Sequence, residues 1–399
     1  MKSISNQSQA ILTERLPIAA LLALAMTGFI CIVTETLPAG LLPEISMTMH
    51  ISQAYAGQMV TSYAIGSLMA AIPLTIATRG WPRRRVLLLT IAGFFTFNSI
   101  TALSHDYILT LIARFFAGAS AGLAWSLLAG YARRMVAPHQ QGRALAVAMI
   151  GTPIALSLGV PMGTFLGGFI GWRIVFWIMS GLALILMLWV ILKVPNYPGQ
   201  KVHESMPLKK VFTTLGVRPI LAVVITWMLA HNMLYTYIAP FIASAGINQR
   251  IDLVLLAFGI ASLFGIWITS QLIDRYLRTT ILLSLAAFSF TAIVLGLATH
   301  ISMIVYVCVV IWGVTFGGAA TLLQTALADA AGRGADVALS MNVVVWNLAI
   351  ALAGVTGGLL LDLLGVWIFP WVITILVMVA FIIAYFSRCY AFKSGPRDA

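Results

Sequence analysis

Two ionisable residues lie inside long apolar stretches, where a charged side chain is costly. Glu35 stands in "FICIVTETLPAGLLPEIS" (29–46), with no Lys or Arg near it in the sequence, and Arg114 stands in "LIARFFAGASAG" (111–122). A carboxylic acid placed there can take up a proton on one side of a membrane and release it on the other. An arginine keeps its charge and needs a carboxylate, carbonyls, water or an anionic substrate. The alternatives are a permanently protonated structural Glu35 and an Arg114 that reaches the membrane surface.

Nine polar or aromatic side chains on predicted helices are candidates for a small-molecule site, because such sites combine aromatic walls with a few hydrogen-bonding groups. Gln58 with Ser62, and His231 with Tyr235, have the i,i+4 spacing that places two side chains on one helix face. The structural alternative for each is a hydrogen bond between helices. The candidate substrate-binding residues are Gln58, Ser62, Trp125, His231, Asn232, Tyr235, Asn342, Trp346 and Asn347.

A third set of residues is suited to conformational change. The stretch "IGTPIALSLGVPMGTFLGG" (150–168) places two prolines among five glycines. Proline removes a backbone hydrogen bond, so this helix is expected to bend, either as a moving interface or as a static kink. Charged residues in two predicted loops complete the set. The candidate conformational residues are Pro153, Gly159, Pro161, Gly163, Arg83, Arg84, Asp274 and Arg275.

The composition requires elements that span a membrane. Of 399 residues, 61% are hydrophobic and 9% charged, whereas soluble domains are about 45–50% apolar and about 25% charged. A spanning helix needs about 20 mostly apolar residues, and the sequence predicts an all-α protein of twelve such helices. Their expected positions are 17–42, 54–78, 86–104, 107–132, 144–170, 174–195, 219–244, 252–272, 280–298, 301–326, 336–361 and 366–388.

The net charge of +12 is explained by topology. If both termini are cytoplasmic, the inside segments carry twenty Lys and Arg, and the outside loops carry only Arg173 and Arg250. This asymmetry is the positive-inside rule. It predicts a multi-pass protein of the bacterial inner membrane and makes a nucleic-acid partner unnecessary.

Catalytic and cofactor motifs are absent from the sequence. It contains no phosphate-binding loop, no zinc-ligand spacing and no nucleophile triad, and Cys31, Cys308 and Cys389 have no CxxC spacing. We therefore expect no enzyme, no metal and no cofactor. The expected partners are a small-molecule substrate, protons and the lipid bilayer.

A weak internal repeat relates the two halves at an offset of 195 residues. Gly118 falls on Gly313, and Gly159 falls on Gly354, as expected for helix interfaces that need small residues. Glu35 has no charged counterpart in the second half, and neither has Arg114, so both are functional candidates. The predicted units are two pseudo-symmetric six-helix bundles, 1–195 and 219–399, with a cytoplasmic linker at 196–218 and a substrate site between them.

Several motifs resemble those of the major facilitator superfamily, and within it the bacterial drug:proton antiporter family of twelve-helix exporters. These are "TETLPAGLLPEI" (34–45), "RFFAGASAG" (114–122) and "LGVPMGTFLGGFIGWRIVF" (158–176). The first motif, "LGVPMG" and "YTYIAPF" (235–241) are most similar to the branch of sugar, ribonucleoside and amphenicol exporters. The resemblance implies a monomer and a role of Arg114 in proton coupling.

One motif departs from that family pattern. In "TIATRGWPRRR" (75–85), Arg79 stands where the family has an aspartate, although the following basic cluster is present. The usual charge latch of this loop is therefore in doubt. "SQLIDRY" (270–276) retains an Asp-Arg pair in the second half.

Together these features predict a proton-coupled exporter of drugs, sugars or nucleosides that works by alternating access, in which Glu35 exchanges the proton. The nearest alternative is a facilitator or importer of a small neutral solute with the same fold. A membrane receptor or an intramembrane enzyme is a further alternative, but the sequence has no sizeable soluble domain and no catalytic constellation.

Overall fold

The computed structural model describes residues 16–199, 207–247, 250–393 and 395, and every regular element in these ranges is helical. Part of the predicted linker and the terminal charges Lys2, Arg15 and Arg397 lie outside the described residues. The main helices are α2 (Ile18–Gly40), α3 (Leu42–Met49), α4 (Gln53–Ala77), α5 (Arg83–Leu103), α6 (Tyr107–Arg134), α7 (Gln141–Met149), α8 (Gly151–Ile154), α9 (Val160–Ile170), α10 (Trp172–Lys193), α11 (Leu208–Phe212), α12 (Val217–Thr236), α13 (Ile238–Ala243), α14 (Ile251–Ala298), α15 (Ser302–Gly317), α16 (Ala319–Ala331), α17 (Ala335–Leu364) and α18 (Phe369–Phe386).

Ten stretches in the described residues are long and apolar enough to cross a membrane. Eight of them correspond to single predicted windows, but two are longer. The 48-residue helix α14 covers the windows 252–272 and 280–298, and it contains a non-helical residue, Tyr276, with φ −129° and ψ 27°. The stretch Ser302–Leu364 covers the windows 301–326 and 336–361. The all-helical membrane fold is therefore confirmed, with ten stretches where the sequence predicts twelve helices.

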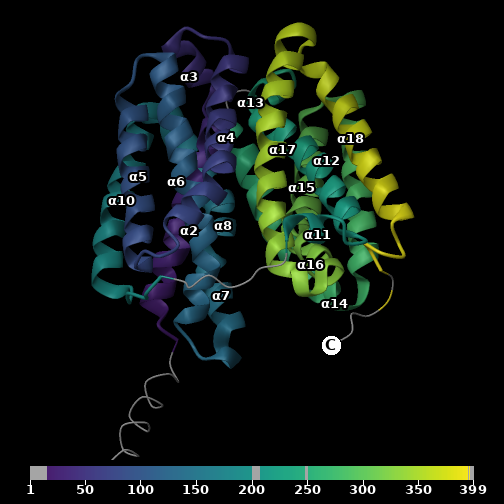
Figure 1. Cartoon of the computed structure of the whole chain (residues 1–399). Helices are drawn as coiled ribbons and strands as arrows, with labels where there is room; N and C mark the ends of the chain where they lie inside the picture. Colours follow the sequence, from purple (N-terminus) through teal and green to yellow (C-terminus); the bar gives the residue numbers. More distant parts are fainter. Residues whose placement is uncertain (1–15, 200–206, 248–249, 394, 396–399) are drawn as a thin grey trace, which may run out of the picture.

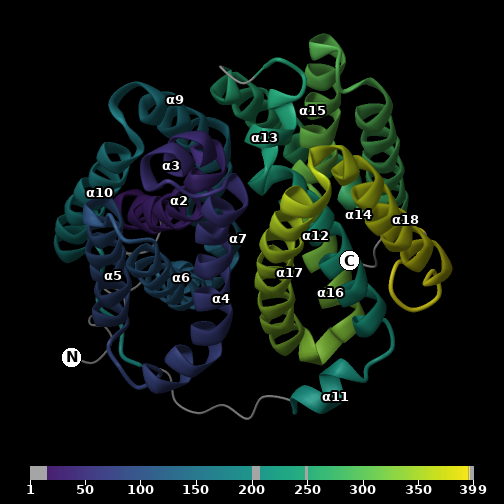
Figure 2. The ribbon, with the colours of Figure 1, turned by 90° about the horizontal axis from the view of Figure 1, so that it is seen from above.

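The helices gather in two groups along the chain. Figures 1 and 2 show α2–α10 on one side of the molecule and α12–α18 on the other. Helices α3 and α13 lie at one end, and α7 lies at the opposite end (Figure 1). In the half of α4 that begins at the α3 end, Val60 and Ala64 pack with Ile350 and Ala351 of α17. Toward the opposite end of α4, the side chains of Met69, Ile72 and Ile76 are exposed.

Glycines allow the closest helix contacts inside the first group. A Cβ added to Gly118 of α6 would meet the backbone of Tyr63 in α4, and one added to Gly66 would meet the backbone of Phe115. In a bilayer, helices gain no hydrophobic free energy by leaving lipid, so this close backbone contact contributes to their association. The α4–α6 pair forms the rigid support on which Arg114 is held.

Gly118→Ala tests this contact. We expect the added methyl group to separate α4 from α6 and to lower stability by about 1–3 kcal/mol, the usual cost of overpacking. The measurement is the apparent melting temperature of the purified protein in detergent. Gly130→Ala is the matched control on the same helix, because a Cβ at Gly130 meets nothing within 4 Å. Equal melting temperatures of the two variants would contradict the prediction.

Candidate functional site

Arg114 is completely buried and is held by backbone carbonyls. Its Nε donates to the carbonyl of Met59 at 3.2 Å, and its Nη2 donates to the carbonyl of Glu35, also at 3.2 Å. The guanidinium lies 4.9 Å from the ring centroid of Tyr63 and 5.6 Å from that of Phe176. Hydrogen bonds and cation–π contacts offset part of the cost of a buried charge. Arg114 therefore ties α6 to both α2 and α4.

Glu35 lies beside this clamp, but its carboxylate does not pair with Arg114. The side chain is buried, and among the described residues it receives no hydrogen bond and forms no ion pair. One turn away, Tyr63 donates to the carbonyl of Cys31 at 2.9 Å, and Asn98 donates to Thr34 Oγ1 at 3.1 Å. The backbone of α2 is therefore held by Tyr63 and Arg114, and the carboxyl group of Glu35 has no hydrogen-bond partner among the described residues.

His231 belongs to an aromatic cluster in the second group of helices. Trp312 Nε1 donates to His231 Nδ1 at 3.2 Å, and the rings of His231 and Phe316 stack with centroids 3.3 Å apart. Tyr235 and Phe258 flank the imidazole at 5.6 and 5.7 Å between centroids. Because an indole nitrogen can only donate, Nδ1 accepts, and the hydrogen of the neutral imidazole is on Nε2. His231 can therefore donate a hydrogen bond through Nε2.

Gln58 and Ser62 make the hydrogen bonds between helices that the sequence left as an alternative. Ser62 donates to the carbonyl of Leu111 at 2.7 Å. The amide of Gln58 donates to the carbonyl of Gly354 at 3.0 Å and to the hydroxyl of Tyr237 at 3.3 Å. In this conformation both side chains are hydrogen-bonded to other groups of the protein.

The other predicted substrate-binding residues are dispersed. Asn232 donates to Met228 within its own helix at 2.8 Å, and Asn347 donates to Val343 at 2.9 Å. The side-chain oxygen of Asn342 is buried and has no hydrogen-bond partner among the described residues. Trp346 packs against the Val60–Ile350 contact, and Trp125 lies against Gly28 of α2.

The predicted bend in the fifth helix is present as an interruption. Between α8 and α9 the chain forms a π-helical turn, Ala155–Gly159, directly before Val160 and Pro161. Pro161 has no N–H to continue the helical hydrogen bonds, and π turns are common where that pattern is broken. Gly159 faces Phe29 and Val33 of α2, where a Cβ would lie 2.7–2.8 Å from their side chains.

The loop arginines bind carbonyls in place of the missing aspartate. Arg83 Nη2 donates to the carbonyl of Arg79 at 2.7 Å. Arg84 Nη1 lies 3.4 Å from the carbonyl of Ile191 and 3.5 Å from that of Val194, at the end of α10. Asp274 and Arg275 directly precede Tyr276, the residue at which α14 departs from helical geometry.

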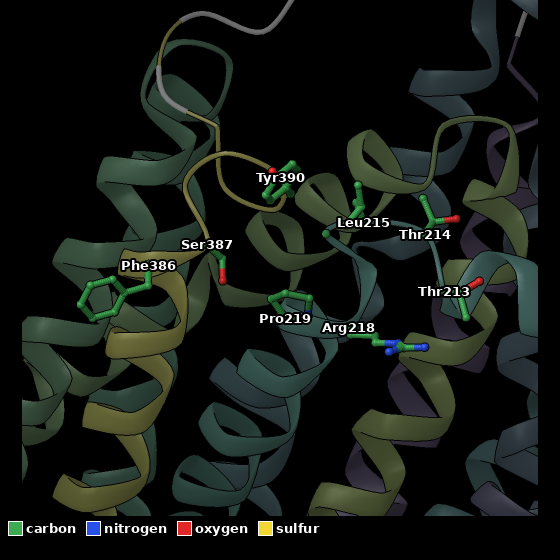
Figure 3. Close-up of a pocket in the computed structure, with 9 residues that line it drawn as sticks. Thr213, Thr214, Leu215, Arg218, Pro219, Phe386, Ser387 and Tyr390 are labelled. Carbon is green, nitrogen blue, oxygen red and sulfur yellow. The ribbon is translucent and has the colours of Figure 1, made fainter.

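Figure 3 shows a pocket of about 250 Å³ away from all the predicted site residues. It lies between the start of α12 and the end of α18, with Arg218, Pro219 and Ser387 in its lining. Most of its polar side chains already form hydrogen bonds within the protein. Thr213 and Thr214 donate to carbonyls of α11, and Arg218 Nε donates to the carbonyl of Phe212. No group of three or more metal-ligating side chains occurs in the described ranges.

Sequence reasoning missed three residues of these networks. Trp312 orients His231, Tyr63 contacts Arg114, and Tyr237 joins Gln58 to Gly354. Tyr237 stood within the quoted segment "YTYIAPF", but its contacts come from residues more than 100 positions away, so no local pattern indicates them.

An all-helical chain of apolar spans with a clamped charge in its interior has the features of a multi-pass membrane transporter. A family model for the Major Facilitator Superfamily matches residues 24–353, and the chain belongs to this superfamily. It is therefore a transporter and not an enzyme.

Two similar proteins are purine ribonucleoside efflux pumps. The chain is 29% identical over 354 residues to the purine ribonucleoside efflux pump NepI of Escherichia coli O6:H1 (strain CFT073), with 87% of this chain and 88% of the relative covered. It is also 29% identical over 353 residues to the pump of the same name in Shigella sonnei (strain Ss046), with the same shares covered.

Arg114→Lys tests the clamp. A single ammonium group cannot reach the carbonyls of Met59 and Glu35 as the two guanidinium nitrogens do, so we expect the loss of at least one charge-assisted hydrogen bond, worth about 1.5–3 kcal/mol. The readout is a lower melting temperature in detergent. Arg250→Lys is the control, because the Arg250 side chain is 56% exposed. An Arg114→Lys protein as stable as the control would disprove the clamp.

Proposed function

We propose that this protein is a proton-coupled exporter of small molecules, with purine ribonucleosides as the first candidates. The observation that carries the proposal is the buried Glu35 carboxyl group, which has no hydrogen-bond or ion-pair partner among the described residues while Arg114 holds its backbone. A carboxyl group in this position can release and bind a proton without breaking a salt bridge. The similarity to the purine ribonucleoside efflux pumps NepI supports export and a nucleoside substrate.

The proposal assigns twelve crossings in two six-helix bundles, with bundles at 1–195 and 219–399 and a linker at 196–218. A 48-residue helix such as α14 is about 72 Å long at 1.5 Å per residue, more than twice a bilayer core of about 30 Å. Two crossings in α14, two in Ser302–Leu364 and one in each of the eight other stretches make twelve. With both termini cytoplasmic, the positive-inside rule is satisfied, and the α3 end faces outward from the inner membrane.

The place where the two groups of helices meet supports alternating access. The contacts of Val60 and Ala64 with α17 lie in the proposed outer half of α4, whereas side chains toward the inner end of α4 are exposed. This conformation then corresponds to an inward-facing state that accepts substrate from the cytoplasm. One proton moving inward contributes about 2.3 kcal/mol per 100 mV of membrane potential toward the outward step.

The aromatic cluster is the proposed substrate-recognition element. A purine base has a flat face that stacks on aromatic rings and an edge that accepts hydrogen bonds. The imidazole of His231 stacks on Phe316, and because Nδ1 accepts from Trp312, its one donor is Nε2–H. Asn342 of α17 is a separate candidate, because its buried amide oxygen has no partner in the described part of the chain and can accept from an amino or hydroxyl group.

Glu35→Gln tests proton coupling. In proteoliposomes with an imposed pH gradient, a purine ribonucleoside should induce proton movement in the wild type and none in this variant, because an amide cannot carry the proton. Glu44→Gln is the matched control nine residues further along the chain, in α3, and should retain the coupled flux. Full proton movement in Glu35→Gln would exclude the mechanism. Nucleoside flux without proton movement in the wild type would indicate a facilitator.

Trp312→Phe tests the orientation of His231. Without the indole donor the imidazole can adopt either tautomer, so we expect the KM for a purine ribonucleoside to rise about five- to tenfold while the maximal rate is kept. Trp227→Phe is the control, because Trp227 is also fully buried and its Nε1 has no partner among the described residues. An unchanged KM in Trp312→Phe would remove His231 from the recognition element.

A further inference from the structure

Tyr237 lies between α12 and α13 at the α3 end of the molecule. It is fully buried, and its φ of −108° and ψ of 29° end α12 after Thr236. The short helix α13 follows directly, so the Tyr237 side chain leaves the chain at a turn. From this position the aromatic ring of Tyr237 lies between α4 and α17.

Three glycines from both groups of helices make room for this ring. A Cβ added to Gly57 of α4 would lie 2.5 Å from ring carbon Cε1 of Tyr237. A Cβ added to Gly357 of α17 would lie 2.7 Å from Cε2, and one added to Gly358 would lie 2.8 Å from the hydroxyl oxygen. Any other residue at these positions would displace the ring. The glycine cradle, Gly57 with Gly357 and Gly358, therefore fits tyrosine closely.

Hydrogen bonds also join Tyr237 to α4 and α17. The hydroxyl of Tyr237 donates to the carbonyl of Gly354 at 2.6 Å. Gln58 of α4 donates to that carbonyl at 3.0 Å and to the hydroxyl at 3.3 Å. The side chain of Phe369 at the start of α18 meets the Tyr237 ring edge-on at 5.9 Å between centroids. One residue thus joins α4, α12, α17 and α18.

We propose that Tyr237, seated in the glycine cradle and bonded through Gln58, is the lock that keeps the outer side of the transporter closed. The proposal rests on the alternating-access function and the orientation given above. It assigns Gln58 a positioning role in this conformation, in addition to the substrate-binding role predicted from the sequence. Opening outward requires the ring to leave the cradle and both hydrogen bonds to Gly354 to break.

The proposal can be tested by labelling Val60→Cys in a background with Cys31, Cys308 and Cys389 replaced. Val60 is buried in the α4–α17 contact, further along α4 from the outer end than Gly57 and Gln58. A membrane-impermeant maleimide added outside intact cells should react slowly with the parent. We expect labelling about tenfold faster in Tyr237→Ala and Gly57→Ala, and about fivefold faster in Tyr237→Phe, which keeps the ring but loses its hydroxyl.

Two matched controls separate a lock from general loosening. Tyr131→Phe removes a hydroxyl that donates to the carbonyl of Pro195 at 2.6 Å within the first group of helices, and Gly130→Ala adds a methyl group where nothing lies within 4 Å. Both should label like the parent. Parent-like labelling of Gly57→Ala and Tyr237→Phe in properly inserted protein would overturn the lock.

The labelling needs neither substrate nor a proton gradient, so it separates the two proposals. If Glu35→Gln retains full proton movement while the Tyr237 variants label rapidly, the coupling mechanism fails and the lock stands. If Glu35→Gln loses proton movement and the Tyr237 variants label like the parent, the lock fails and the coupling mechanism stands.

Discussion

A guanidinium that cannot lose its charge sits in the interior of a membrane protein, and the first group of helices supplies acceptors for two of its three nitrogens, Nε and Nη2, while Nη1 is buried without a partner among the described residues. A charge at the bilayer centre costs at least about 2.5–3.5 kcal/mol, so Arg114 must find acceptors within the protein. It finds the backbone carbonyls of Met59 in α4 and Glu35 in α2. For these acceptors to be in reach, α4 and α6 must touch backbone to backbone, which explains the glycines at 66 and 118.

In this arrangement the positioning of Glu35 does not depend on the charge of its carboxyl group, as it would in a salt bridge. Arg114 binds the backbone carbonyl of Glu35 and forms no ion pair with its carboxylate. In the proposed mechanism the carboxyl group therefore changes protonation while the backbone remains in place. A buried salt bridge would instead couple every proton transfer to the loss of an ion pair, at a cost of several kcal/mol.

The sequence predicted the parts of this structure that depend on local patterns. Apolar length located the helices, Pro161 predicted the interruption of the fifth one, and the costly charge of Arg114 predicted its need for partners. Residues whose partners are distant could not be predicted. Gln58 and Ser62 share a helix face, but only the fold shows that one meets Gly354, 296 residues away, and the other Leu111. The sequence of Asp274 and Arg275 likewise gave no indication that α14 continues through Tyr276.

The two proposed moving parts differ in the kind of interaction that holds them. The contact at the outer end uses an aromatic ring, glycines and hydrogen bonds between uncharged groups, so its strength does not depend directly on protonation. The ionisable groups, Glu35 and Arg114, take no part in this contact. A proton arriving at Glu35 can then bias the equilibrium between conformations without weakening the closure itself, provided that the two conformations hold the proton with different affinity. Uncharged contacts also suit a closure that must open and reform in each cycle, because separating them does not strand an unpaired charge at membrane depth.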